Sequence, residues 1–247
     1  MKRFIPLGVL LFLFGCGSRA PRESRRIDLV TDRHQAGRLL ASLSPETLTR
    51  DERIAEARNL AGFLQKHPGW LPLATVEKLM ALHEAAPGIV EGAFVNYLKV
   101  WPVPGYYPLR DDPAAVRVIR LLAKWNQGPL LLQAATALNR RITVEDPRAK
   151  VRLTLADVSH LLPAGTERQE LLKEFLLSKT ARYTLFKATA SAMGRIGTRD
   201  PSMVPIFIRG LYTVRQGISA SLESAFALGT CYADAAALSR RLLVSVA

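Results

Sequence analysis

Residues 112–125 read DPAAVRVIRLLAKW, and this stretch contains the pattern that decides the fold. Its apolar residues recur at the spacing i, i+3, i+4, i+7 of one helix face: Val118, Leu121, Leu122 and Trp125. Asp112 is suited to cap the start of this helix, and Pro113 suits its first turn. The stretch therefore predicts a short amphipathic α-helix with a defined first residue.

The same spacing recurs on both sides of this stretch. It is found at two further sets of positions: Ala57, Leu60, Ala61 and Leu64, and Val204, Phe207, Ile208 and Leu211. Breaks at Pro, Gly or Asp-Pro divide the pattern into helices of about 12 to 17 residues, and no credible alternating strand pattern interrupts it. We therefore expect an all-α chain of roughly ten to twelve helices from about residue 27 onward.

Three Asp-Pro pairs predict helix starts, at Asp112-Pro113, Asp146-Pro147 and Asp200-Pro201. The first two pairs are 34 residues apart, which is the length of a helical hairpin repeat. Residues 185–197 (LFKATASAMGRIG) and 200–205 (DPSMVP) resemble α-helical repeats of the HEAT type, and residues 146–156 are a looser copy. The resemblance covers about residues 110–247. It implies a right-handed α-α superhelix, or solenoid, of short helical hairpins.

The N-terminus has the three parts of an export signal. Lys2 and Arg3 are followed by the apolar run FIPLGVLLFLF at residues 4–14 and then by Gly15 and Cys16. The apolar run is too short to span a bilayer, which needs about 20 residues. The sequence Leu-Phe-Gly-Cys at 13–16 resembles the bacterial lipobox, from which it departs only at the phenylalanine.

The lipobox resemblance implies that Cys16 takes a diacylglyceryl group, that the leader is cut before it, and that the mature chain is held on a membrane. Gly17 and Ser18 follow the cysteine where enterobacterial inner-membrane lipoproteins have Asp. The resemblance therefore implies the outer membrane, with the domain facing the periplasm. The tether is basic, and it either lies on anionic lipid or forms a solvated spacer; its arginines are Arg19, Arg22, Arg25 and Arg26.

These features divide the chain into five segments. We expect a cleaved signal peptide at 1–15, a lipid-modified cysteine and tether at 16–26, an N-terminal helical region at 27–98, a loop at 99–111 and HEAT-like repeats at 112–247. The loop contains three prolines and is not a regular helix. Its aromatic side chains either anchor a partner or fill a gap between helices: Trp101, Tyr106 and Tyr107.

The formal net charge of +13 favours acidic partners, namely anionic lipid, an acidic protein or nucleic acid. Residues 110–152 contain nine Lys or Arg residues and four acids. Four of these arginines are predicted to bind a partner or, alternatively, to form a solvated outer face: Arg117, Arg120, Arg140 and Arg141. Because export separates the chain from nucleic acid, we expect no nucleic-acid partner unless the leader is misread.

The sequence contains no local catalytic, metal-binding or phosphate-binding motif. His83 continues the apolar helix face of residues 76–80, so a packed or half-buried imidazole is favoured over a metal ligand or a base. Cys231 is interpreted as a buried thiol rather than a reactive one. We expect no cofactor and no metal ion, and the sequence identifies no small-molecule substrate. The nearest candidates for a catalytic carboxylate are Glu84 and Glu91.

These observations favour a non-enzymatic, membrane-anchored lipoprotein that acts as a helical-repeat scaffold or adaptor for another cell-envelope protein. One alternative is an envelope enzyme of helical-superhelix type that acts on peptidoglycan or lipid. A second alternative, which applies if the leader is misread, is a basic HEAT-like protein that binds nucleic acid.

The substitution Cys16→Ser tests the lipobox, because it removes the one leader thiol that can take the diacylglyceryl group. We expect the wild-type chain to label with a palmitate analogue and the variant to remain unlabelled. The variant should also become partly extractable by alkaline carbonate, since its apolar core is too short to span a bilayer. Cys231→Ser is the matched control and should label like the wild type. Equal labelling of Cys16→Ser and wild type, or no labelling of either, would contradict the lipoprotein interpretation.

Overall fold

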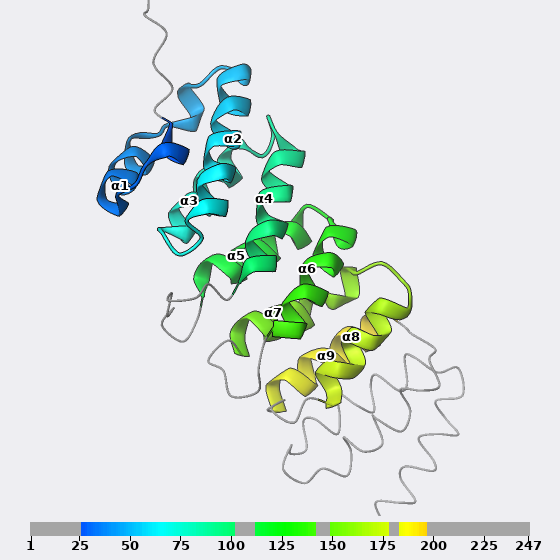
Figure 1. Cartoon of the computed structure of the whole chain (residues 1–247). Coiled ribbons are helices and arrows are strands. Elements are labelled where there is room, and N and C mark those ends of the chain that lie inside the picture. The colour runs from blue at the N-terminus through cyan, green and yellow to red at the C-terminus, as the bar shows by residue number, and fades with distance from the viewer. Residues whose placement is uncertain (1–25, 102–111, 142–148, 178–182, 197–247) are drawn as a thin grey trace, which may run out of the picture.

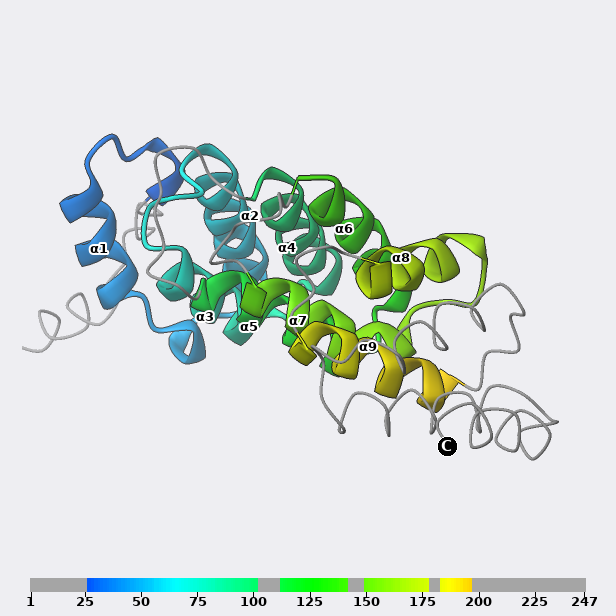
Figure 2. The same cartoon turned by 90° about the horizontal axis from the view of Figure 1, so that it is seen from below.

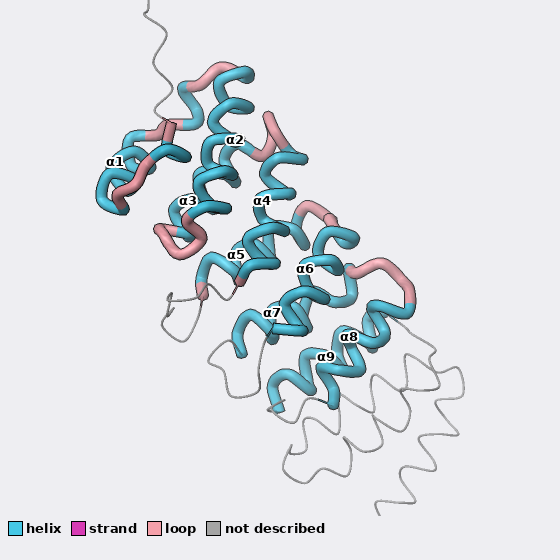
Figure 3. The backbone as a smooth tube through the Cα atoms, in the orientation of Figure 1, coloured by secondary structure: helices cyan, strands magenta, loops and turns pink. Residues whose placement is uncertain are grey.

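The computed structural model describes residues 26–101, 112–141, 149–177 and 183–196 (Figure 1). Within these ranges the chain forms helices joined by loops, and Figure 3 shows no strand in this part of the chain. The all-α fold expected from the spacing of apolar residues is therefore confirmed for the described residues. The helix start predicted at Asp200, the face at 204–211 and Cys231 lie outside the described residues.

Nine α-helices and three short 3-10 helices make up the described part of the chain. The α-helices are α1 (Arg33–Ser42), α2 (Arg50–Lys66), α3 (Pro72–Leu82), α4 (Pro87–Val100), α5 (Pro113–Lys124), α6 (Gly128–Arg141), α7 (Ala149–Val158), α8 (Thr166–Leu177) and α9 (Tyr183–Ile196). The 3-10 helices are η1 (Ile27–Leu29), η2 (Pro45–Thr47) and η3 (Ser159–Leu161). With 10 residues, α1 is shorter than the sequence pattern predicted. The helix start predicted at Asp146 lies outside the described residues, which resume at the first residue of α7.

The helices from α2 onward pack in two layers. Helices α2, α4, α6 and α8 lie side by side in one layer, and α3, α5, α7 and α9 lie side by side in the other (Figure 2). Each helix of the first layer also packs against its successor in the second, except that few contacts join α6 to α7. The first-layer helices begin at residues 50, 87, 128 and 166, a spacing of 37 to 41 residues. The described chain is thus a stack of helical hairpins.

One continuous core runs through this stack. Buried apolar side chains form a single cluster from Ile27 to Ala188, with α4 and α5 both in its middle. Lys99 and Val100, which the sequence assigned to the loop at 99–111, belong to α4, so the prediction is wrong for these two residues; residues 102–111 lie outside the described residues. The N-terminal region at 27–98, which matched no known repeat pattern, has the same hairpin packing as the region that follows.

Short polar motifs fix where the helices begin and end. Asp32 accepts hydrogen bonds from the first backbone N–H groups of α1, and Thr49 forms a capping box with Glu52 at the start of α2. At the end of α5, Asn126 has a φ of 56°, and the backbone N–H of Gln127 donates to the Leu122 carbonyl over 2.9 Å. This is a Schellman motif, which ends α5 and lets α6 begin at Gly128.

Asp112 caps α5 as the sequence predicts, and its carboxylate also binds two side chains from the α4 side of the hairpin. Its Oδ1 atom accepts from the amides of Ala114 (2.9 Å) and Ala115 (3.1 Å). Its Oδ2 atom accepts from the Tyr97 hydroxyl (3.3 Å) and from the Trp101 indole N–H. Asp112 is only 2% exposed, and Tyr97 and Trp101 are buried with it. The carboxylate therefore joins the end of α4 to the start of α5 inside the core.

The substitution Asp112→Ala is expected to lower the free energy of unfolding by about 3 kcal/mol, because it removes a cap and leaves two buried donors without their acceptor. Asp32→Ala is the matched control. Asp32 makes the same pair of backbone hydrogen bonds but is exposed, so its loss should be clearly smaller. Urea unfolding followed by circular dichroism measures both variants. Equal losses for the two variants would show that the buried bonds to Tyr97 and Trp101 contribute nothing.

Candidate functional site

The structure separates the residues that the sequence grouped as partner-binding. Cys16, Tyr106 and Tyr107 lie outside the described residues. Trp101 is fully buried, and its indole N–H is bound to Asp112. The prediction that Trp101 contacts a partner is therefore wrong. Its burial agrees with the alternative interpretation, in which the side chain fills a gap between helices.

Arg117 and Arg120 lie on the exposed face of α5, together with Lys124 one turn further on. The three cations follow the spacing i, i+3, i+7, so they form one row along the helix. The opposite face of α5 is buried in the core, with Val118, Leu121 and Leu122 at 4% exposure or less. We call the row of Arg117, Arg120 and Lys124 the basic ridge. It has no acid on its own helix.

Arg140 and Arg141 do not belong to this ridge. They are the last two residues of α6, which lies in the other layer of the stack. Their side chains are outside the described part of the structure. The partner-binding role predicted for Arg140 and Arg141 therefore stays a prediction, while Arg117 and Arg120 share one exposed row with Lys124.

Side chains of neighbouring helices surround the ridge. The Arg117 guanidinium approaches the Met80 sulfur of α3 at 3.4 Å. On the other side, Asp157 of α7 lies near Arg120. Burial raises the pKa of the Asp157 carboxyl above its usual value, while the charges of Arg195, Arg120 and His160 act to lower it. Asp157 thus places a carboxyl group close to Arg120 of the ridge and to Arg195 of α9.

Two of these groups also bind the backbone of Asp157. Its carbonyl accepts from the Arg195 guanidinium at 3.1 Å and from Nδ1 of His160 at 2.9 Å. These hydrogen bonds fix α9 and η3 against the end of α7. The position of Arg195 beside Asp157 results from tertiary packing, and no sequence pattern signalled it.

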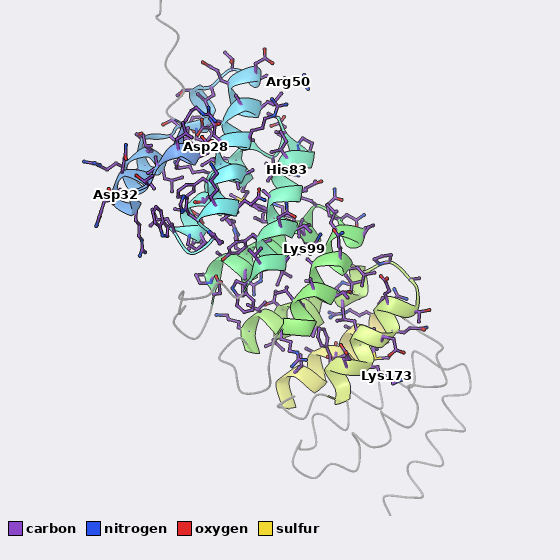
Figure 4. All side chains as sticks on the ribbon, viewed as in Figure 1. Asp28, Asp32, Arg50, His83, Lys99 and Lys173 are labelled. Atoms are coloured by element: carbon purple, nitrogen blue, oxygen red, sulfur yellow. The ribbon has the colours of Figure 1, made fainter. Side chains whose placement is uncertain are left out.

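A second polar cluster joins the ends of several helices. Glu91 of α4 is 8% exposed, and its Oε1 atom accepts from Nε2 of His83 (2.9 Å) and from the side-chain amide of Gln127 (3.0 Å). The His83 ring stacks on Trp125, with ring centres 3.5 Å apart and planes 6° apart. Phe94 lies beyond Trp125 at 5.8 Å. His83, which is labelled in Figure 4, directly follows the last residue of α3.

This cluster has a clear structural role. His83 follows α3, Glu91 lies in α4, and Trp125 and Gln127 lie in the loop between α5 and α6. The half-buried position expected for His83 is confirmed. Glu84, the other candidate carboxylate, is exposed. Within the described residues, no group of three or more His, Cys, Asp or Glu side chains is arranged to hold a metal ion.

Comparison of the chain with models of protein families, with curated proteins and with solved structures finds no match. The site is therefore interpreted from its own geometry.

Glu91→Ala is expected to lower the free energy of unfolding by about 2 kcal/mol, because it removes two partly buried hydrogen bonds that link three parts of the stack. Glu84→Ala removes a carboxylate of the same type from an exposed position next to His83, and it should change stability by no more than about 0.5 kcal/mol. Thermal unfolding followed by Trp fluorescence and circular dichroism compares the two. A Glu91→Ala variant as stable as Glu84→Ala would contradict the structural role of the cluster.

Proposed function

We propose that this protein is a membrane-anchored scaffold that binds an acidic segment of another cell-envelope protein along the basic ridge of α5. The observation that carries the proposal is the ridge itself. Three exposed cations stand in one row on a helix whose other face is fixed in the core. Such a row can pair with acidic side chains at helical or extended spacing, and it needs no rearrangement of the fold.

The architecture supports a scaffold. A stack of helical hairpins presents an extended surface on which each helix contributes one row of side chains. The hairpin spacing of 37 to 41 residues in the first layer is consistent with the proposed HEAT-like, right-handed superhelix. We propose this superhelix as the finer architecture of the chain.

The membrane anchor is the second part of the proposal, and the leader and Cys16 support it. Among the described helices, none combines the length and apolar character needed to cross a bilayer. Lipid attached at Cys16 would hold the stack at the outer membrane on its periplasmic side. Two or three acyl chains suffice for stable anchoring, where one chain is marginal.

The enzyme alternative has weaker support. A carboxylate bound to an imidazole can act in acid–base catalysis, and Glu91 and His83 are such a pair. However, the bound Oε1 atom of Glu91 also accepts from Gln127, and the His83 ring is covered by Trp125. The arrangement supports a link between helices, and we therefore place the scaffold first.

Charge reversal on the ridge tests the proposal. A photo-crosslinking amino acid at position 124 should capture an envelope protein in intact cells, and Arg117→Glu with Arg120→Glu should lower the yield at least about fivefold, as expected when attraction at two positions becomes repulsion. The matched control is Arg50→Glu with Arg58→Glu, which makes the same change of charge on exposed positions of α2. Its cross-link yield should stay at the wild-type level.

Asp157→Asn is expected to change the cross-link yield in the opposite direction. Because Asp157 lies near Arg120, removing its negative charge should raise the cross-link yield. Circular dichroism should show a folded chain for every variant, since exposed substitutions change stability by about 0.5 kcal/mol each. A ridge variant that is folded and keeps the full yield would refute binding along α5. A ridge variant that unfolds would show that these arginines are structural.

A further inference from the structure

The start of the described chain forms a distinct surface at one end of the stack. Helices η1 and α1 lie there, with α1 against α3 and η1 against α2 (Figure 1). Their exposed side chains include Arg26, Leu29, Arg33, Gln35 and Arg38. We call this set the N-terminal face. It lies at the opposite end of the described stack from α8, as the labels of Asp32 and Lys173 show in Figure 4.

An apolar side chain stands out on this face. Leu29 is 60% exposed, more than Val100 (41%) and Leu73 (36%), the other large apolar side chains on the surface of the described residues. It borders an open cavity of about 370 Å³. The cavity lining is partly apolar and consists of Arg26, Leu29, Val30, Thr31, Gln35 and Leu39. Exposed leucine beside long cationic side chains is the composition of surfaces that settle into the headgroup region of a membrane.

Asp28 and Asp32, the two acids of the N-terminal face, both accept hydrogen bonds. Asp28 is paired with Arg26 at 2.9 Å. Asp32 accepts from the amides of His34 and Gln35, and these hydrogen bonds lower the pKa of its carboxyl. Arg33 and Arg38 are exposed on α1, whose sequence contains no acid. With Arg26, Arg33 and Arg38 against Asp28 and Asp32, the N-terminal face keeps a net positive charge next to the exposed side chain of Leu29.

The chain that precedes this face adds the proposed lipid anchor and further positive charge. Arg26 is ten residues beyond Cys16, so the face lies within about 35 Å of the proposed lipid anchor even if the tether is fully extended. The intervening residues include Arg19, Arg22 and Arg25 against the single acid Glu23. Each cation close to an anionic membrane contributes about 1 kcal/mol of attraction.

We infer that the N-terminal face docks on an anionic lipid surface, with Arg33 and Arg38 among the lipid phosphates and Leu29 at the boundary with the acyl chains. Only the proximity of the membrane rests on the proposed anchor at Cys16, since the face itself is formed by described residues. Docking would hold the stack by one end. It would leave α5, which is separated from α1 by α3, open to a protein partner.

The test uses the full chain without its lipid-accepting cysteine, so that acylation cannot contribute. A Cys16→Ser, Cys231→Ser, Leu29→Cys chain labelled with an environment-sensitive fluorophore is mixed with vesicles of phosphatidylglycerol or of phosphatidylcholine. We expect a blue shift of the emission with phosphatidylglycerol and little shift with phosphatidylcholine. Arg33→Glu with Arg38→Glu should abolish most of the shift and lower vesicle partitioning on the order of tenfold.

Two controls make the test specific. The first places the label at Gln133, an exposed position of α6, where no shift is expected. The second is Arg117→Glu with Arg120→Glu, which changes the charge equally and should leave the Leu29 shift unchanged. If Cys231→Ser impairs folding, flotation of the unlabelled Cys16→Ser chain with the same vesicles compares the two charge-reversal variants instead.

Several results would overturn the inference. Equal shifts with both lipids would show that the apolar leader drives binding, and equal shifts at Leu29 and Gln133 would show that no face is selected. Loss of the shift in the α5 variant alone would assign lipid binding to the basic ridge. The photo-cross-link from position 124 reports on the protein partner separately, so failure of either proposal is recognised without the other.

Discussion

The buried carboxylate of Asp112 is the interaction on which the rest of this structure most depends. A charged group removed from water is costly unless its hydrogen bonds are satisfied, and here four donors meet it. Two of the donors belong to the start of α5, and the other two come from the end of α4 and the residue that follows it. Helix capping and closure of the hairpin therefore use the same side chain. This bond sets where α5 begins and thus which of its faces turns to the core.

The basic ridge is a consequence of that orientation. Once the apolar residues of α5 are directed into the stack, Arg117, Arg120 and Lys124 are directed out of it in one row. At the other end of the helix, the Schellman motif at Asn126 places Trp125 and Gln127 against His83 and Glu91. Polar contacts thus hold both ends of α5, and its exposed face stays available for binding.

The sequence predicted local structure well and long-range contacts poorly. The periodicity of 112–125 correctly predicted the start, length and buried face of α5, because these depend on residues close together in the chain. The hairpins at 50–100 were missed as repeats because α3 and α4 begin at prolines without a preceding Asp. The pairing of Glu91 with Gln127 joins residues 36 positions apart, and no motif encodes it. From the sequence, Trp101 could either anchor a partner or fill a gap between helices, and only its position beside Asp112 distinguished the two roles.

The central claim is that an acidic partner is held along α5 mainly by exposed charge. The salt dependence of the cross-link from position 124, measured in isolated membranes, tests this claim most directly. Between about 0.1 M and 1 M salt the screening length falls from about 10 Å to about 3 Å, so the account predicts a steep decrease in yield. A yield that is unchanged or rises with salt would indicate an apolar interface and would contradict the account.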